Sequence, residues 1–361
     1  MTTQTQSYRD TKAISNSILS LFEQDLRAFR SYWLYNKDPF DSDEENISFD
    51  LGSVVDTLLT RKDNFYDIYY VSEVPDPTPQ MKKFSKNLFK IWPTTSTTSE
   101  EREKLFEKAY TDTKFGRDSF ENVKKKFGEC KDYFNTLVRA RGKTVISKEL
   151  YNKASGIVDQ LLTNPFTKDI FAIQEVELAG LPIVSVINQL EIYSEYTSEE
   201  GGCNIPIKGA LDKVIIDHNK KTVYPYDIKT SSNLHEFKES YIKYRYFRQA
   251  SYYTWLLSKW LKEGGWIGYT IAPFKFIVAS TIGEGAYIYE VSLADLSISV
   301  EGGTTKRFET YRGWRTLLDE ICWHVKNNKW DYPKHVYDSN GIVQLDEFMG
   351  DTGVLYDSIL F

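Results

Sequence analysis

The sequence predicts a mixed α+β fold, in which a central, mostly antiparallel sheet is flanked by helices and carries a helical elaboration on its N-terminal side. Helical periodicity dominates up to about residue 163. Strand-like runs rich in β-branched and aromatic residues follow between 171 and 231, separated by turns that contain Gly or Asn. Helical and strand-like segments then alternate to about residue 327. This order indicates an α+β or mixed α/β core.

The N-terminal part is expected to be helical. Residues 1–12 are polar and are predicted to be disordered. A helix is predicted from about Ser15, because this residue can cap the apolar 3–4 repeat that follows it. An acidic loop at 38–48 precedes a second helix, predicted near Gly52. Residues 73–145 are predicted to form a charged helical elaboration.

A single domain is predicted over residues 13–332, with a catalytic core at about 165–295. Its expected strands are 171–178, 181–197, 205–217 and 221–231, followed by a helix at 233–263, strands at about 268–280 and 286–292, and a helix at about 305–327. Residues 333–361 are predicted to form a polar, aromatic tail.

Composition limits the class of protein and the class of metal. No apolar run reaches the roughly 20 residues that span a bilayer, and the N-terminus has no apolar signal core, so a cytoplasmic protein without membrane contact is expected. The three cysteines (Cys130, Cys203 and Cys322) are too few and too scattered for a disulfide framework or an iron–sulfur cluster. The four histidines are scattered as well. Any metal should therefore bind to carboxylates, which favours Mg²⁺, with Mn²⁺ as a substitute.

The net charge of −6 argues weakly against a nucleic-acid partner, because phosphate binding usually leaves a basic footprint. A carboxylate metal site itself contributes acids, however, and basic clusters can still occur locally. Global charge therefore does not decide the class of partner.

The segment 209–230 carries the strongest chemical pattern. A turn at 218–221 would place Asp212 directly across from Asp227 on the paired strand. Because side chains alternate along a strand, Asp227 and Lys229 share one face. Such charges can form an ordinary cross-strand salt bridge. They can also hold a divalent cation that lowers the pKa of an attacking water in phosphodiester hydrolysis.

Roles follow from the residue types. Asp212 and Asp227 are predicted to bind the metal, and the carbonyl of Ile228 could add a ligand. Lys229 would position the water or stabilise charge that develops on the phosphate. A further acid is expected from the neighbouring strand, with Glu191 as the candidate and Glu195, on the same face, as its substitute.

The helix after this hairpin adds a second signal. Gln249 and Tyr253 are four residues apart and therefore share one helix face. Arg245 and Arg248 lie among aromatic residues in the same segment, a combination that suits an anionic polymer with stackable bases. Alternatively, the glutamine is a surface residue and the tyrosine belongs to the core.

Together these motifs resemble the PD-(D/E)XK nuclease superfamily. The matching residues are Gly209-x-x-Asp212, Asp227-Ile228-Lys229 and Gln249-x-x-x-Tyr253. The last motif is similar to that of the exonuclease branch, which includes the RecB nuclease domain, lambda exonuclease and the RecE-like phage recombination exonucleases. The Ser15-Asn16-Ser17 start, the Leu51–Asp56 segment and the ending, a strand at 274–280 and a helix reaching Trp330, also look RecE-like. The resemblance covers about residues 13–332, most securely 205–256. Asp56 stands where many relatives have a histidine, and it is either a site residue or a helix-surface residue.

The resemblance implies a restriction-endonuclease-like core and a Mg²⁺-dependent exonuclease that digests the ends of double-stranded DNA, in phage-type recombination. It implies that Gln249 and Tyr253 support the lysine or touch DNA. It also implies a homo-oligomer, a single-strand annealing protein as a partner, and a phage or prophage origin, hence the cytoplasm of a bacterial host. The alternatives are an endonuclease or repair nuclease of the same superfamily, or a non-catalytic DNA-binding protein that keeps the fold.

Overall fold

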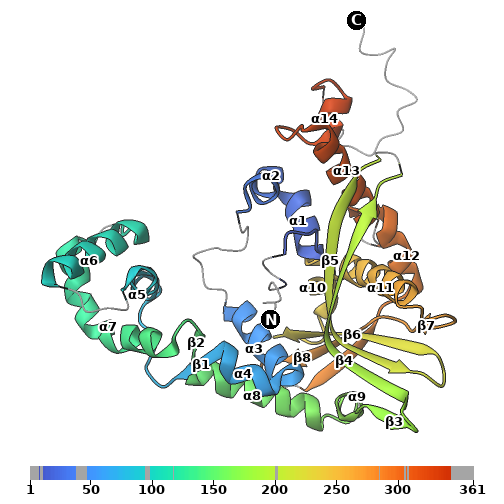
Figure 1. Cartoon of the computed structure of the whole chain (residues 1–361), viewed down its shortest axis with the longest axis horizontal. Helices are drawn as coiled ribbons and strands as arrows, with labels where there is room; N and C mark the ends of the chain where they lie inside the picture. The colour runs from blue at the N-terminus through green and yellow to red at the C-terminus, as the bar shows by residue number, and fades with distance from the viewer. Residues whose placement is uncertain are drawn as a thin grey trace, which may run out of the picture.

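The computed structural model describes residues 8, 11–37, 47–93, 98–116, 118–199, 202–283, 285–304, 306 and 309–342, without the side chains of 47–50. The predictions for most of the N-terminal segment, for 38–46 in the acidic loop and for 343–361 in the tail lie outside these residues. Within the described part, the chain forms 14 α-helices around a seven-stranded mixed sheet, so the predicted mixed α+β class is confirmed (Figure 1).

The central sheet is built mainly from long antiparallel strands. Its order is β3 (Val176–Leu178), β4 (Leu181–Thr197), β5 (Asn204–Asp217), β6 (Thr222–Ser231), β8 (Lys275–Ser280) and β9 (Ala286–Glu290), while β7 (Thr270–Ile271) also pairs with β6. Only the pairs β6–β8 and β6–β7 are parallel. The run at 171–178 becomes a strand only from Val176, because the short helix α9 (Lys168–Ala172) occupies its start.

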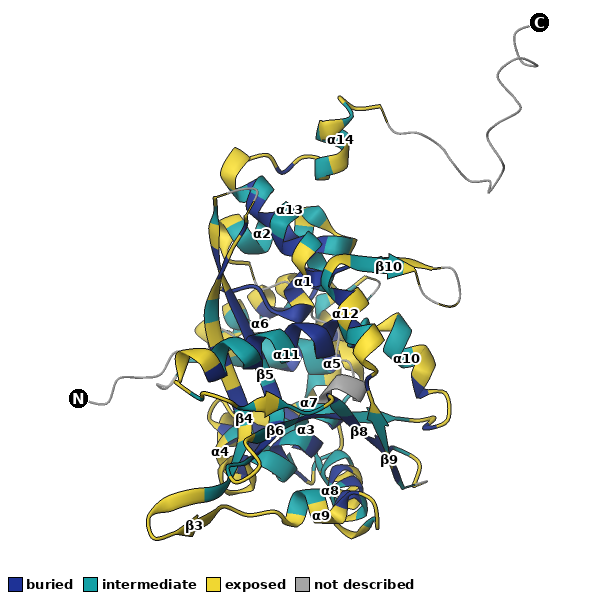
Figure 2. Ribbon diagram, turned by 90° about the vertical axis from the view of Figure 1, so that its right-hand side faces the viewer, coloured by how far each residue is buried: buried dark blue, intermediate teal, exposed yellow. Residues whose placement is uncertain are grey.

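Helices cover both faces of the sheet, as Figure 2 shows for α11 on one side and for α3 and α8 on the other. The first layer comprises α1 (Asn16–Gln24), α2 (Leu26–Tyr35), α10 (Phe237–Lys243), α11 (Tyr246–Glu263), α12 (Leu293–Glu301) and α13 (Trp314–Asn327). The second layer comprises α3 (Ile47–Thr60), α4 (Phe65–Ile68), α8 (Lys148–Thr163) and α9. Each layer encloses its own buried hydrophobic cluster against the sheet.

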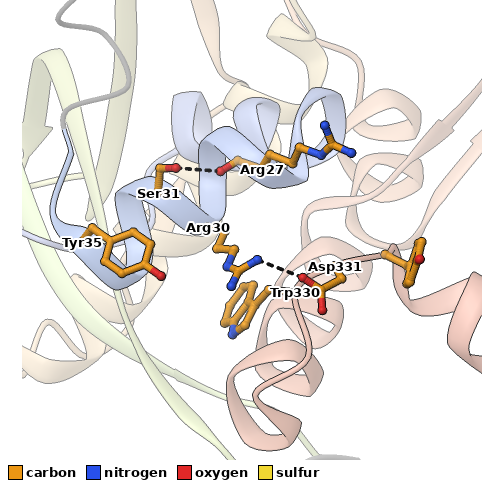
Figure 3. Close-up of a pocket in the computed structure, with 7 residues that line it drawn as sticks. Arg27, Arg30, Ser31, Tyr35, Trp330 and Asp331 are labelled. Atoms are coloured by element: carbon orange, nitrogen blue, oxygen red, sulfur yellow. Dashed lines mark hydrogen bonds and ion pairs between the residues drawn. The ribbon is translucent and has the colours of Figure 1, made fainter.

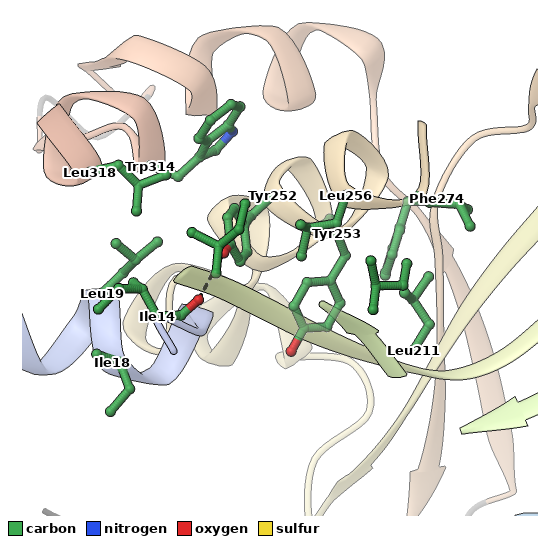
Figure 4. Packing of buried hydrophobic residues seen from close by; sticks show 14 of the residues in the cluster. Ile14, Ile18, Leu19, Leu211, Tyr252, Tyr253, Leu256, Phe274, Trp314 and Leu318 are labelled. Carbon is green, nitrogen blue, oxygen red and sulfur yellow. Dashed lines mark hydrogen bonds between the residues drawn. The ribbon is translucent and has the colours of Figure 1, made fainter. Parts of the chain in front are cut away.

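Close packing of α11 on β5 depends on Gly209. Figure 4 shows Tyr253 and Leu256 of α11 beside Leu211 of β5 in the larger cluster. A Cβ atom on Gly209 would lie 2.6 Å from Cδ1 of Leu256 and 3.2 Å from Cε1 of Tyr253. Glycine therefore allows the helix to approach the strand, and this contact fixes α11 over the middle of β5.

The predicted helical elaboration projects away from the sheet (Figure 1). It consists of α5 (Pro79–Ile91), α6 (Ser99–Thr113) and α7 (Phe120–Ala140), and it has a separate hydrophobic cluster around Phe84 and Leu88. The parallel pair β1 (Tyr69–Ser72) and β2 (Thr144–Ser147) stands at its base.

The C-terminal third differs from the sequence prediction in several places. The helix expected at 233–263 is broken into α10 and α11, because Arg245 takes a left-handed conformation with φ +58°. The helix expected at 305–327 begins only at Trp314. Before it, α12 ends in the hairpin of β10 (Gly302–Thr304) and β11 (Thr310–Arg312), and α14 (Lys334–Asp338) lies within the predicted tail. No helix in the described ranges is both long and apolar enough to cross a membrane.

Candidate active site

The hairpin of β5 and β6 brings Asp212 and Asp227 together. The chain reverses at 218–221, and the paired ladder runs from Asp217–Thr222 to Lys213–Tyr226. One step further, in the same register, Asp212 lies across from Asp227. At this point a side chain replaces the backbone acceptor of the strand pairing, since Oδ2 of Asp212 accepts a hydrogen bond of 2.7 Å from the backbone N–H of Ile228. The two strands therefore diverge where the carboxylates meet.

Asp227 is the buried centre of the group. Its side chain is 3% exposed, and Nζ of Lys229 lies 2.5 Å from its Oδ2 atom. Nε2 of Gln249 donates a hydrogen bond of 2.7 Å to its Oδ1 atom. Among the described residues, Oδ2 has no hydrogen-bond partner besides this ion pair, so one buried carboxylate oxygen retains capacity to accept a further ligand. Lys229 is also placed by Tyr246, whose ring centroid lies 5.0 Å from Nζ.

Gln189 joins Asp56 to the same group. Its Nε2 atom lies 2.7 Å from Oδ1 of Asp56 and 3.2 Å from Oδ1 of Asp212. The sequence left Asp56 open between a site residue and a helix surface, and the structure places it with the other two aspartates. Sequence reasoning missed Gln189 altogether.

The left-handed backbone of Gln189, with φ +53°, explains its position. It lies opposite Asp212, between the pairs Asn188–Lys213 and Leu190–Leu211. Regular alternation is interrupted here on both strands. On β4, Ile187 and Leu190 both contact the cluster on the α11 side of the sheet although they are three residues apart, a spacing that would place them on opposite faces of a regular strand. Leu211 and Val214 do the same on β5. This shift from a period of two to a period of three is the sequence signal that could have located the irregularity.

Burial and mutual repulsion control the charges of the site. Burial is the largest cause that raises the pKa of Asp227 to about 7, with Asp212 adding to it and Lys229 opposing it. Burial, and then the charge of Asp212, also raises the pKa of Asp56 to about 7. The pKa of Asp212 is raised by burial as well. Burial tends to lower the pKa of Lys229, but the neighbouring acids, Asp227 first, raise it overall, so the lysine stays protonated.

The arrangement fits a hard divalent cation that completes its shell from outside the protein. No three Asp, Glu, His or Cys side chains within the described ranges form a ready-made metal-binding group. Mg²⁺ usually binds through one or two carboxylates, waters and substrate phosphates rather than through an all-protein cage. Asp212 and Asp227 supply such a carboxylate pair, and Oδ2 of Asp227 retains capacity for a further ligand.

The structure does not bring Glu191 or Glu195 to this group. Glu191 is exposed, lies opposite Ala210, and accepts a hydrogen bond of 3.0 Å from the hydroxyl of Tyr193. Glu195 is also exposed, further along β4. The register of β4 and β5 explains this result, because Gln189 and not Glu191 lies opposite Asp212. Gln189 stands beside the aspartates instead.

The other residues predicted to touch DNA or to support the site, Arg245, Arg248 and Tyr253, make contacts within the protein. Arg248 is fully buried, and its guanidinium donates to Glu23 Oε2 at 2.8 Å and to Ser20 Oγ at 2.7 Å, so it joins α11 to α1 rather than facing solvent. Arg245 is half-buried, with its guanidinium 4.3 Å from the ring centroid of Tyr311. Tyr253 is buried against Gly209.

A separate hollow of about 520 Å³ lies between α2 and the segment after α13 (Figure 3). It is lined by Arg27, Arg30, Ser31, Tyr35, Trp330, Asp331 and Tyr332, and includes none of the aspartates above. Arg30 is paired there with Asp331 at 2.9 Å. No family model and no curated protein matches the chain. The geometry of Asp56, Asp212, Asp227 and Lys229 is therefore the basis for a proposed function.

Proposed function

We propose that the chain is a metal-dependent nuclease that hydrolyses phosphodiester bonds from the ends of double-stranded DNA, with Mg²⁺ as its metal. One observation carries the proposal: Asp56, Asp212, Asp227 and Lys229, from three separate elements, meet in one group, and Gln249 bonds directly to Asp227. A salt bridge on a solvated sheet face would explain neither the burial of Asp227 nor the bridging of Asp56 and Asp212 by Gln189.

Each residue has a distinct task in this proposal. The cation, when bound, would neutralise a phosphate oxygen and lower the pKa of the attacking water. Asp212 and Asp227 would hold it, with the carbonyl of Ile228 as the predicted further ligand. Lys229, kept protonated by the acids, would orient the water or stabilise charge on the phosphate. Gln249 fixes the rotamer of Asp227, and Gln189 holds Asp56 beside Asp212.

The preference for DNA ends, rather than internal sites, comes from the resemblance of the Gln249–Tyr253 motif to the exonuclease branch. A homo-oligomer, a single-strand annealing partner and a phage origin with action in the bacterial cytoplasm are proposals on the same basis. An endonuclease or repair nuclease of the superfamily would use the same group of residues. A non-catalytic DNA-binding protein would keep the fold without turnover.

One assay separates these functions. Linear duplexes labelled at the 5′ or 3′ end and a covalently closed circle are incubated with Mg²⁺ or with EDTA. We expect loss of the linear DNA only, and only with Mg²⁺. Cutting of the circle would identify an endonuclease, and absence of cutting under any divalent metal would favour the non-catalytic protein.

A matched pair of variants locates the activity. Asp227→Asn should abolish digestion, because it removes a charge from the carboxylate pair. Asp217→Asn changes the same residue type on the same hairpin, at the turn, where Asp217 accepts a bond from the N–H of Lys220. It should retain activity. Equal activity in the two variants would remove the proposed site.

A further inference from the structure

A basic hollow lies at the base of the helical elaboration, where α7 ends and β1 passes. Its volume is about 580 Å³, and it is lined by Tyr70, Val138, Arg139, Ala140, Arg141 and Lys143. The chain turns sharply there, because Arg141 and Gly142 both take left-handed conformations, with φ +51° and +86°. This turn presents three cationic side chains to one concave surface within five residues.

The three cations have no acidic partner within the described ranges. Lys143 donates a bond of 2.6 Å to the backbone carbonyl of Tyr66, and no ion pair involves Arg139 or Arg141. Some lysines elsewhere on the elaboration are paired, as Lys124 is with Glu103 at 2.7 Å. Three exposed, unpaired positive charges around one hollow are unexpected in a chain with net charge −6. Such a surface suits a polyanion.

Part of this charge has a structural explanation, since basic residues at the C-terminal end of a helix interact favourably with its dipole. That effect is confined to the end of α7, where Arg139 lies in the last turn and Arg141 is the C-cap residue. It does not account for Lys143 or for the concave shape. The two explanations also differ in what they predict: a dipole effect changes stability, whereas a binding surface changes affinity for a polyanion.

The hollow is within reach of a duplex held at the candidate active site. Asp56 and Tyr70 are separated only by the end of α3, the short 3-10 helix Lys62–Asn64 and α4. Summing the rise of these elements gives a separation of at most about 30 Å. One turn of B-DNA spans about 34–36 Å. Arg61, whose side chain is 45% exposed, lies on the chain between the two.

We propose that this hollow binds backbone phosphates of the duplex DNA substrate, within one helical turn of the three aspartates. The inference rests on the proposed nuclease function, since it takes its partner from that function. Phosphate contacts position a duplex without reading its sequence. The hollow would therefore fix the path of the duplex as its end enters the site.

The test compares two triple variants of the full chain. Arg139→Gln/Arg141→Gln/Lys143→Gln removes the charges of the hollow. Lys104→Gln/Lys108→Gln/Lys131→Gln removes three exposed charges elsewhere on the same elaboration. Affinity for a 30-base-pair duplex is measured by fluorescence anisotropy in EDTA, which prevents cleavage, over a series of salt concentrations. Thermal melts confirm that both variants fold.

Each phosphate contact contributes about 0.9 to the slope of log K against log salt. We expect the slope to become less steep by about 2–3 in the variant without Arg139, Arg141 and Lys143, and by much less in the control variant. Equal slopes in the two variants would overturn the inference. So would a hollow variant that binds DNA normally but loses affinity for polyglutamate, because the hollow would then serve an acidic polypeptide.

Digestion assays on the same proteins keep this inference distinct from the proposed function. Wild-type protein that binds DNA through the hollow but never cleaves it with Mg²⁺ would overturn the nuclease and leave the hollow as a DNA contact. Normal cleavage with unchanged slopes would overturn only the hollow. Absence of any duplex binding by the wild type would overturn both.

Discussion

The side-chain amide of Gln249 donates a hydrogen bond of 2.7 Å to Oδ1 of Asp227. This bond joins helix α11 to strand β6 at the centre of the cluster of three aspartates. Both residues are buried, and 8% of Gln249 and 2% of Asp227 are exposed. The bond leaves the second oxygen of Asp227 for Lys229 and for an incoming ligand. Gln249 is thus a positioning residue for the proposed metal ligand.

Gln249→Leu should lower the nuclease rate by about 10–100-fold, the usual cost of removing a partner that orients a metal ligand. The Mg²⁺ concentration for half-maximal rate should rise as well, because the carboxylate is no longer fixed in one rotamer. Initial rates over a Mg²⁺ titration measure both effects. Ser258→Ala is the control on the same helix, since its hydroxyl donates to the carbonyl of Trp255 within α11. An unchanged Mg²⁺ dependence in Gln249→Leu would contradict the positioning role.

Gly209→Ala should destabilise the fold by about 1–3 kcal/mol, the typical cost of overpacking a core. The added methyl group would meet Leu256 at 2.6 Å and Tyr253 at 3.2 Å. Chemical denaturation measures the free energy of unfolding. Gly128→Ala, on the exposed face of α7 with nothing near its Cβ position, should instead stabilise by about 0.5–1 kcal/mol. If Leu256→Ala relieves none of the Gly209→Ala defect in a double-mutant cycle, the steric explanation is wrong.

Gln189 combines a side-chain role with a backbone role, and two substitutions separate them. Gln189→Ala and Gln189→Gly both remove the amide that bridges Asp56 and Asp212, so both should lower the nuclease rate. Only glycine tolerates φ +53° freely, and the glycine variant should therefore be more stable than the alanine variant by about 1 kcal/mol. Paired denaturation curves give this difference. A less stable glycine variant would show that the left-handed backbone is not under strain.

The raised pKa of Asp56 predicts a pH dependence of stability in the metal-free protein. Burial and then Asp212 raise this pKa from 3.8 to about 7, so folding favours the protonated carboxyl group. The contribution of Asp56 to the free energy of unfolding is therefore fully present at low pH and is lost as pH rises from about 4 to about 7. Asp56→Asn, which cannot ionise, should melt a few degrees above wild type at pH 8 in EDTA, with a smaller difference near pH 5.

Asp217→Asn is the control, because the fold shifts the pKa of Asp217 in the direction opposite to that of Asp56. Bonds from Lys220, its backbone N–H first, lower the pKa of Asp217, so the ionised form is favoured in the fold. This variant should not gain stability at pH 8. Calorimetry at several pH values distinguishes the two variants, and an Asp56→Asn protein that is less stable than wild type at pH 8 would refute the electrostatic explanation.

The sequence was sufficient to predict the β5–β6 hairpin and its facing aspartates, because turn position and strand alternation are local properties. It was not sufficient for β4, where the sequence pointed to Glu191. The register instead places Gln189, with its left-handed backbone, beside Asp212. Arg248 was predicted as a DNA contact because its neighbours are basic and aromatic. Its partner Glu23 is 225 residues away, and only the tertiary fold brings the two together.

The hydrophobic cluster of α5–α7 shares no residue with the clusters on the two faces of the sheet. Cooperativity in unfolding depends on shared contacts, so the elaboration and the sheet are expected to open as separate units. A single melting temperature would then not describe the chain, since two-state behaviour fails when units unfold independently. Hydrogen exchange should show lower protection in α6 than in β5. The stability changes predicted for the Gly209, Gln189 and Asp56 variants belong to the transition of the sheet, whereas the change predicted for Gly128→Ala belongs to the transition of the elaboration.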